Sequence, residues 1–98
     1  MPKKKEEEGP KRLTIYTIKL DEDQMEKLEA VCDKRLYAFY HVDHTRFAFK
    51  SPHDGVNIVG YKSGKLVVQG KGTEGWVQNV LEPEVTGMAT LGYEEFHH

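Results

Sequence analysis

Two short apolar stretches separated by a three-residue turn constrain the fold of this chain more than any other feature. Residues 56–61 and 65–70 are rich in branched aliphatic side chains and alternate in polarity, which is typical of β-strands with one buried face. The intervening Lys62-Ser63-Gly64 is short enough to reverse the chain direction within a hairpin. The pattern therefore predicts an antiparallel pair of strands.

The residues before this hairpin predict a strand, a helix and a second strand. Residues 13–20 are rich in β-branched and aromatic side chains. Asp21 follows as a helix N-cap, with Gln24 in capping-box register. Residues 46–50 alternate in polarity, and residues 51–55 have the composition of a turn. The apolar face expected for the helix comprises Met25, Leu28, Val31, Cys32 and Leu36.

A short second helix is predicted after the hairpin. Thr73 is suited to its N-cap, and Pro83 follows its expected end, because proline disrupts helix interiors. The aromatic-rich residues 37–44 fit either a strand or a packed loop. The apolar face of this second helix comprises Trp76, Val77, Val80 and Leu81.

The order of elements, β-α-β-β-β-α, predicts an α+β fold. We expect a four-stranded antiparallel sheet with both helices on one face and the other face open. The expected organisation is a disordered charged tail at residues 1–11, one domain at 12–83 and a linker at 84–98. A chain of 98 residues has room for one such domain.

The composition of the chain limits the cellular compartment and the kinds of structural site that we expect. The single cysteine excludes an internal disulfide and a zinc knuckle, and we expect Cys32 to be a core residue. No apolar run approaches the roughly 20 residues of a membrane span. We therefore expect a monomeric cytoplasmic protein without a membrane partner.

Charge is segregated along the chain, although the total is only −2. Between residues 35 and 72 there are six basic residues (Arg35, Arg46, Lys50, Lys62, Lys65, Lys71) against two acidic ones (Asp43, Asp54), a net charge of +4. Acidic residues concentrate at positions 6–8, 21–33 and after 74. Such segregation is more informative about binding partners than the total charge.

Strand alternation predicts which side chains occupy the open face. If the aromatic and aliphatic side chains of the three later strands point to the helices, the open face carries cations, amides, a tyrosine and small apolar residues, without a carboxylate. Amides and hydroxyls hydrogen-bond to sugar and phosphate oxygens, and lysines neutralise phosphates, so this composition favours binding over an ordinary solvated face. The predicted set is Arg46, Ala48, Lys50, Asn57, Val59, Tyr61, Lys65, Val67 and Gln69.

Signals for catalysis are weak. Residues 60–65 lack the spacing of a phosphate-binding loop, and they join two strands, so nucleotide hydrolysis is not expected. The glycines at 70 and 72 open a helix whose amides suit one phosphate, or they simply form a strand-to-helix turn. His41, His44 and His53 share no register that favours a metal site over isolated surface histidines. Two acidic residues between 35 and 72 are too few for two-metal hydrolysis.

Residues 56–72 resemble the signature stretch of the N-terminal domain of bacterial ribonuclease HIII. In that family a tyrosine-lysine-serine-glycine-lysine turn precedes a hydrophobic strand ending in glutamine-glycine, as Tyr61–Lys65 and Gln69-Gly70 do here. Residues 46–52 and 13–36 resemble its preceding strand and its opening strand and helix, whereas residues 37–44 match poorly.

The resemblance implies a fold like one half of TATA-binding protein and a domain that grips an RNA/DNA hybrid. In that family a separate domain cuts the RNA with four carboxylates and magnesium. We therefore expect this chain to bind substrate without being an enzyme by itself, and to hold no cofactor or metal. The residues implied for nucleic-acid binding, together with those given by alternation, are Arg46, Lys50, Asn57, Tyr61, Lys62, Ser63, Lys65, Gln69 and Lys71.

An alternative from another class remains open at this stage. The open sheet face, or the aromatic patch at residues 37–40, also suits a protein–protein interaction module.

Overall fold

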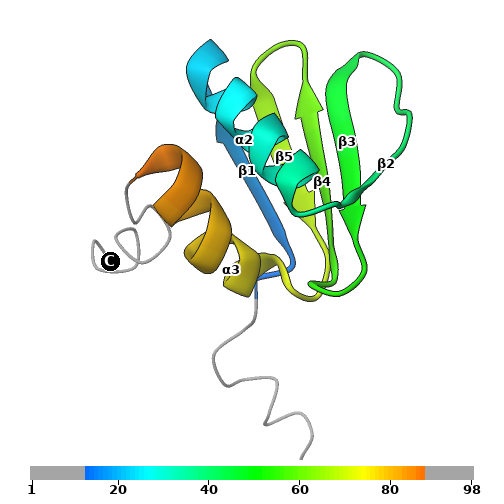
Figure 1. Cartoon of the computed structure of the whole chain (residues 1–98), viewed down its shortest axis with the longest axis vertical. Coiled ribbons are helices and arrows are strands. Elements are labelled where there is room, and N and C mark those ends of the chain that lie inside the picture. Colours follow the sequence, from blue (N-terminus) through cyan, green and yellow to red (C-terminus); the bar gives the residue numbers. More distant parts are fainter. Residues whose placement is uncertain (1–12, 88–98) are drawn as a thin grey trace, which may run out of the picture.

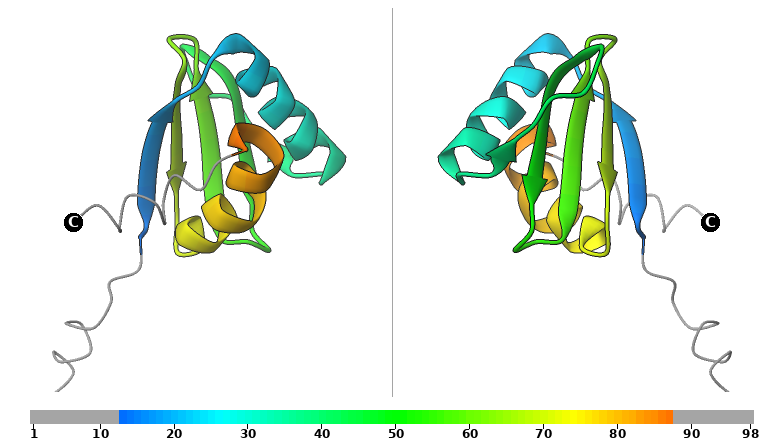
Figure 2. Two further views of the ribbon diagram at one scale, coloured as in Figure 1. Left: turned by 90° about the vertical axis from the view of Figure 1, so that its left-hand side faces the viewer. Right: turned by 90° about the vertical axis from the view of Figure 1, so that its right-hand side faces the viewer.

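In the computed structural model, which describes residues 13–87, a five-stranded antiparallel sheet has both helices on one of its faces (Figures 1 and 2). The strand order is β1-β5-β4-β3-β2, so β5 returns to pair with the first strand. The elements are β1 (Ile15–Lys19), α2 (Glu22–Lys34), β2 (Ala38–Phe39), β3 (Thr45–Ser51), β4 (Val56–Tyr61), β5 (Lys65–Gln69), α3 (Thr73–Trp76) and η1 (Val77–Thr86).

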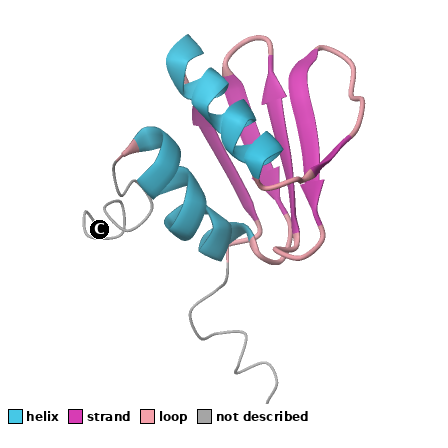
Figure 3. Cartoon of the chain, viewed as in Figure 1, coloured by secondary structure: helices cyan, strands magenta, loops and turns pink. Residues whose placement is uncertain are grey.

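The α+β class, the antiparallel sheet and the two helices are confirmed, but the predicted count of four strands is wrong. The fifth strand is β2, which pairs with β3 through Ala38 opposite Lys50 and Phe39 opposite Phe49. It lies in the aromatic stretch whose pattern fitted either a strand or a loop. Figure 3 shows it as a short strand at the edge of the sheet. The predicted tail (1–11) and residues 88–98 of the predicted linker lie outside the described range.

Helix α2 begins with the predicted capping box. The Asp21 carboxylate accepts a hydrogen bond from Gln24 N at 2.9 Å, and Gln24 Oε1 accepts one from Asp21 N at 3.0 Å. The helix ends earlier than predicted, because Leu36 adopts a left-handed backbone conformation (φ 62°) two residues after the last helical residue. Leu36 is consequently 86% exposed, and its expected place on the buried face of the helix is wrong.

The second helix runs beyond its predicted end. Segment α3 continues into the π-helical η1, which contains Pro83 and buries Val85 in the core. The wide turns tolerate Pro83, whose missing N–H removes one hydrogen bond without ending the helix. Arg35 ties the end of α2 to η1 through a 2.6 Å ion pair with Glu84. None of the helices within residues 13–87 is long and apolar enough to cross a membrane.

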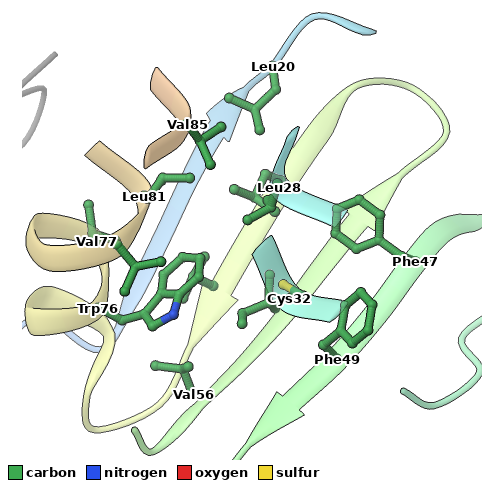
Figure 4. Close-up of a cluster of buried hydrophobic side chains, with 14 of the residues drawn as sticks. Leu20, Leu28, Cys32, Phe47, Phe49, Val56, Trp76, Val77, Leu81 and Val85 are labelled. Carbon is green, nitrogen blue, oxygen red and sulfur yellow. The ribbon is translucent and has the colours of Figure 1, made fainter. Parts of the chain in front are cut away.

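The core fills the space between the sheet and the helices (Figure 4). Cys32 is fully buried there, as predicted, and burial raises the pKa of its thiol to about 12. Figure 4 shows Leu28 and Cys32 of α2 facing Phe47 and Phe49 of β3, with Trp76 contributed from the other helix. The fully buried strand residues Ile58, Leu66 and Val68 complete this layer.

Gly60 is required by the packing of Phe47. The two residues are opposite each other in adjacent strands, on the face that the helices cover. A Cβ at Gly60 would lie 2.6 Å from Phe47 Cζ and 2.9 Å from Cε1, closer than carbon atoms pack. Phe47 is only 1% exposed, so its ring cannot move without disturbing the core.

We predict that Gly60→Ala lowers the free energy of unfolding by about 1–3 kcal/mol, because it overpacks the ring of Phe47. Urea denaturation followed by circular dichroism measures the change. Gly75→Ala is the matched control, since a Cβ there meets nothing within 4 Å. A similar loss in both variants would contradict the packing argument.

Candidate functional site

The sheet face opposite the helices, called the open face below, carries three rows of side chains across neighbouring strands. The pairing register places Ile15, Gln69, Asn57 and Lys50 in one row, and Thr17, Val67, Val59 and Ala48 in the next. At the third level Lys19 lies opposite Lys65, and Thr45 lies opposite Tyr61. No strand in the described range contains an aspartate or glutamate, so the open-face rows combine cations, amides, hydroxyl groups and apolar residues, among them the half-exposed Ile15.

The lysines of the open face and its turns lack acidic partners. Lys50, Lys62, Lys65 and Lys71 are exposed, and none forms an ion pair with another residue in the range 13–87. Lys19, which the sequence analysis did not select, lies directly opposite Lys65. Like charges in a cross-strand pair destabilise a sheet. This arrangement is suited to an anion that binds between them.

The predicted residues form two groups at opposite ends of the open face. Tyr61, Lys62, Ser63 and Lys65 line a shallow hollow of about 430 Å³ at the β4–β5 turn, together with His44 and Val67. Lys50, Asn57 and Gln69 line a second hollow at the other end, beside Gly70. Lys71 follows Gly70 in the turn that leads to α3.

Arg46 is not available on the open face as predicted. A β-bulge between Thr45 and Phe47 interrupts the alternation on which that prediction relied. The guanidinium instead binds Glu22 of α2 in bidentate fashion, with Nη1–Oε1 and Nη2–Oε2 distances of 2.8 Å. The hydrogen bonds from Arg46 lower the pKa of the Glu22 carboxyl. Arg46 therefore serves the junction between sheet and helix.

Tyr40 belongs to the open face, although its sequence context gave no indication of this. Its backbone N–H donates to Ala48 O at 2.9 Å, and Lys50 Nζ lies 5.1 Å from the centroid of its ring. Burial, and to a smaller extent neighbouring Tyr61, raises the pKa of the Tyr40 hydroxyl. Tyr40 therefore stabilises Lys50 by a cation–π interaction and adds an aromatic surface close to Tyr61.

The other aromatic residues of the 37–40 stretch do not join Tyr40 in one patch. The Tyr37 hydroxyl accepts a hydrogen bond from Trp76 Nε1 at 3.0 Å and donates to Asp54 Oδ2 at 3.1 Å. Asp54 also accepts from Ser51 Oγ at 2.8 Å. Burial is the main reason that the pKa of Tyr37 is raised. Phe39 instead packs edge-on against Phe49, 5.6 Å between ring centroids, on the side of the helices.

The glycines around Lys71 have a structural explanation. A Cβ at Gly72 would collide with Asp54 O, and one at Gly70 with Gly55 O. The amides of Gly72 and Thr73 already donate to Gly55 O and Gly70 O, both at 3.2 Å. The glycines therefore let the β3–β4 turn approach closely, and the amides of Gly72 and Thr73 are already occupied.

The histidines do not converge in the structure. His41 Nε2 lies 3.2 Å from Asp43 Oδ1, on a fully solvated part of the loop. Among residues 13–87, no group of three or more histidine, cysteine or acidic side chains is arranged to hold a metal ion.

A comparison with known protein families identifies the family of this chain. The family model described as "Domain of unknown function (DUF3378)" matches residues 16–89. The crystal structure of Aquifex aeolicus RNase H3 superposes with a TM-score of 0.62 at 25% sequence identity, covering 68% of this chain and 26% of that one.

Curated relatives carry the name ribonuclease HIII. The protein of Chlamydia trachomatis serovar L2 is 52% identical over 42 residues, which are 43% of this chain and 13% of that protein. That of Chlamydia muridarum is 35% identical over 72 residues, 74% of this chain and 23% of the relative. The chain thus spans less than a quarter of the length of these relatives.

We predict that Tyr37→Phe lowers the free energy of unfolding by about 1–3 kcal/mol, because it leaves the Trp76 indole N–H without its acceptor. Tyr40→Phe is the matched control, since the Tyr40 hydroxyl forms no hydrogen bond with another described residue. Thermal and urea denaturation measure both variants. Equal stability of the two variants would contradict a structural role for Tyr37.

Proposed function

The chain belongs to the DUF3378 family and is similar to the N-terminal domain of ribonuclease HIII, and from this membership we propose that it binds a nucleic-acid duplex on its open face. The preferred duplex in this proposal is an RNA/DNA hybrid. The observation that carries it is the open face itself, where lysines without acidic partners flank amides and small apolar side chains.

The chemistry of this face fits contacts to a nucleic-acid backbone. Lysines at the two ends, Lys62 and Lys65 at one and Lys50 and Lys71 at the other, are suited to phosphates. Val59 and Val67 between them offer a small apolar surface to sugars. Contacts of this kind carry little sequence information, and each neutralised phosphate makes binding more sensitive to salt.

The expected affinity is modest. With about three to five phosphate contacts, the domain should bind a duplex in the micromolar range or more weakly. In a longer parent protein, a domain of this affinity raises the local concentration of substrate near a tethered catalytic domain.

Catalysis is assigned to the rest of such a parent. Among the described residues, no group of three or more histidine, cysteine or acidic side chains is arranged to hold a metal ion. We propose that the magnesium ions and carboxylates of a ribonuclease belong to a separate domain. We also propose that the domain formed by the present chain is monomeric and works in the cytoplasm.

A second candidate function, protein–protein interaction, is supported by two exposed apolar side chains near the edge strand. Leu36 is 86% and Phe39 is 66% exposed. The dependence of binding affinity on salt concentration distinguishes the two candidate functions. A phosphate-dominated interface weakens steeply between low and physiological salt, whereas an apolar interface does not.

We predict that Lys65→Glu combined with Lys71→Glu abolishes duplex binding while the fold stays intact, because both side chains are exposed and without acidic partners in the described range. An amide-shift titration of the labelled protein with a short RNA/DNA hybrid at low salt measures binding. Wild-type shifts should cluster at Asn57, Tyr61–Lys65 and Gln69–Lys71.

Two controls separate this proposal from general charge effects. Lys27→Glu combined with Lys34→Glu makes the same charge change on exposed positions of α2, and binding should weaken far less. Arg46→Ala should also leave most of the binding, since Glu22 already holds that guanidinium. Normal binding by the Lys65/Lys71 variant would place the interface elsewhere.

A further inference from the structure

The edge strand β2 leaves an aromatic side chain uncovered on the helix side of the sheet. Phe39 lies opposite Phe49 of β3, and the two rings pack edge-on with 5.6 Å between their centroids. Phe49 is only 2% exposed, whereas Phe39 is 66% exposed. Within residues 13–87 no strand lies beyond β2, so the outer side of the Phe39 ring faces solvent. An aromatic ring in this position is available to pack against a partner.

The backbone of Phe39 offers hydrogen bonds on the same edge. The Tyr40 N–H donates to Ala48 O at 2.9 Å, so these two residues form a hydrogen-bonded pair. Pairs in an antiparallel ladder alternate between hydrogen-bonded and non-hydrogen-bonded, so the adjacent pair of Phe39 and Phe49 is non-hydrogen-bonded. The N–H and C=O of Phe39 consequently point away from β3. They offer one donor and one acceptor to an extended segment that adds along the edge.

Helix α2 borders this edge with a row of acidic side chains, called the acidic stripe below, which comprises Glu22, Glu26, Glu29 and Asp33. Their spacing of four, three and four residues places them on one side of the helix. That side faces β3, because Glu22 binds Arg46 of that strand. The hydrogen bond to Glu22 is also the main reason that the pKa of Arg46 is raised, and the charges of Glu29 and Glu26 contribute. In Figure 1 the side of α2 toward β3 is also the side toward β2.

Most of the negative charge in the acidic stripe is not neutralised. Arg46 pairs with Glu22, whereas the other three carboxylates form no ion pair within residues 13–87. Negative charge beside an exposed aromatic ring repels phosphates and attracts a segment that carries lysine or arginine. The ring of Phe39 adds to this preference, because basic side chains lay their aliphatic part on apolar surface and their charge over aromatic faces.

We propose that the β2 edge, with Phe39 at its centre and the acidic stripe beside it, binds an extended basic segment of another protein. The segment hydrogen-bonds to the Phe39 backbone, packs an apolar side chain on its ring and places lysine or arginine side chains against the acidic stripe. The proposal goes beyond nucleic-acid binding and does not depend on it, because the helices and the open face lie on opposite sides of the sheet (Figure 2). A duplex and a protein partner then occupy different surfaces of one domain.

Titration with synthetic peptides tests this surface. The probe is a short lysine-rich peptide with a central phenylalanine, and two control peptides replace the lysines by glutamate or the phenylalanine by serine. Amide shifts of the labelled full chain at low salt should cluster at residues 38–40 and along residues 26–33 of α2. The probe should bind about tenfold more tightly than either control peptide, because only the probe has both the charge and the apolar group.

Two single substitutions identify the contacts. Phe39→Ser should weaken binding of the probe about tenfold, and Asp33→Asn should weaken it about threefold. Ile15→Ser is the matched control for the ring, since Ile15 is 51% exposed on the opposite edge strand. Asp23→Asn is the matched control for the charge, since Asp23 is exposed on α2 outside the acidic stripe. Both controls should bind the probe as the wild type does, and circular dichroism verifies that all four variants are folded.

Three results would overturn the inference: absence of probe binding, equal affinity for the probe and its serine control, or unchanged binding by both Phe39→Ser and Asp33→Asn. The second result would reduce the interaction to charge attraction, and the third would place the peptide elsewhere. None of them affects the proposed function, because neither substitution alters the open face. Both variants should therefore keep the wild-type affinity for the RNA/DNA hybrid, and a loss of hybrid binding would show that the two surfaces are not separate.

Discussion

The two helices supply enough apolar surface to cover one face of the sheet, and this limit determines the rest of the structure. Helix-facing strand residues such as Ile58 and Val68 are completely buried against α2 and η1. No further layer exists within residues 13–87, so the alternating positions between them face outward, and most of them are polar or small. The open face is therefore a direct consequence of this two-layer arrangement, and its chemistry is free to serve binding.

Charge separation follows the same two layers. Helix α2 carries five acidic residues, whereas the strands carry none, so a polyanion meets an attractive face and a repulsive one. Such a distribution orients an approaching partner before contact. The pairing of Arg46 with Glu22 neutralises a strand cation that lies beside α2. The strand and turn lysines Lys19, Lys50, Lys62, Lys65 and Lys71 have no such acidic partner within the described residues.

Local sequence patterns predicted most of this fold. The predictions that failed depend on single backbone conformations or on pairing between strands, which local patterns do not report. The β4–β5 hairpin, the Asp21 cap and the buried alternation depend on neighbours in sequence, which the pattern reports directly. Leu36 and His44 adopt left-handed backbone conformations, with φ of 62° and 65°, which their residue types do not predict. They lie at the two ends of residues 37–44, whose sequence pattern fitted either a strand or a loop. The bulge at Arg46 and the position of Lys19 opposite Lys65 depend on pairing between strands, so spacing along the chain could not reveal them. Within the candidate site, the residues of the hairpin were therefore predictable, whereas Tyr40 and Lys19 were not.

Lysines lie at both ends of the open face, and the apolar row of Val59 and Val67 lies between these ends. A face that bound only through lysines would hold any duplex and weaken uniformly with salt. A domain that binds weakly is useful when it is tethered, because the tether supplies an effective concentration in the millimolar range for short flexible linkers. Tight binding by the domain alone would instead slow the release of a duplex, so modest affinity is consistent with the proposed role.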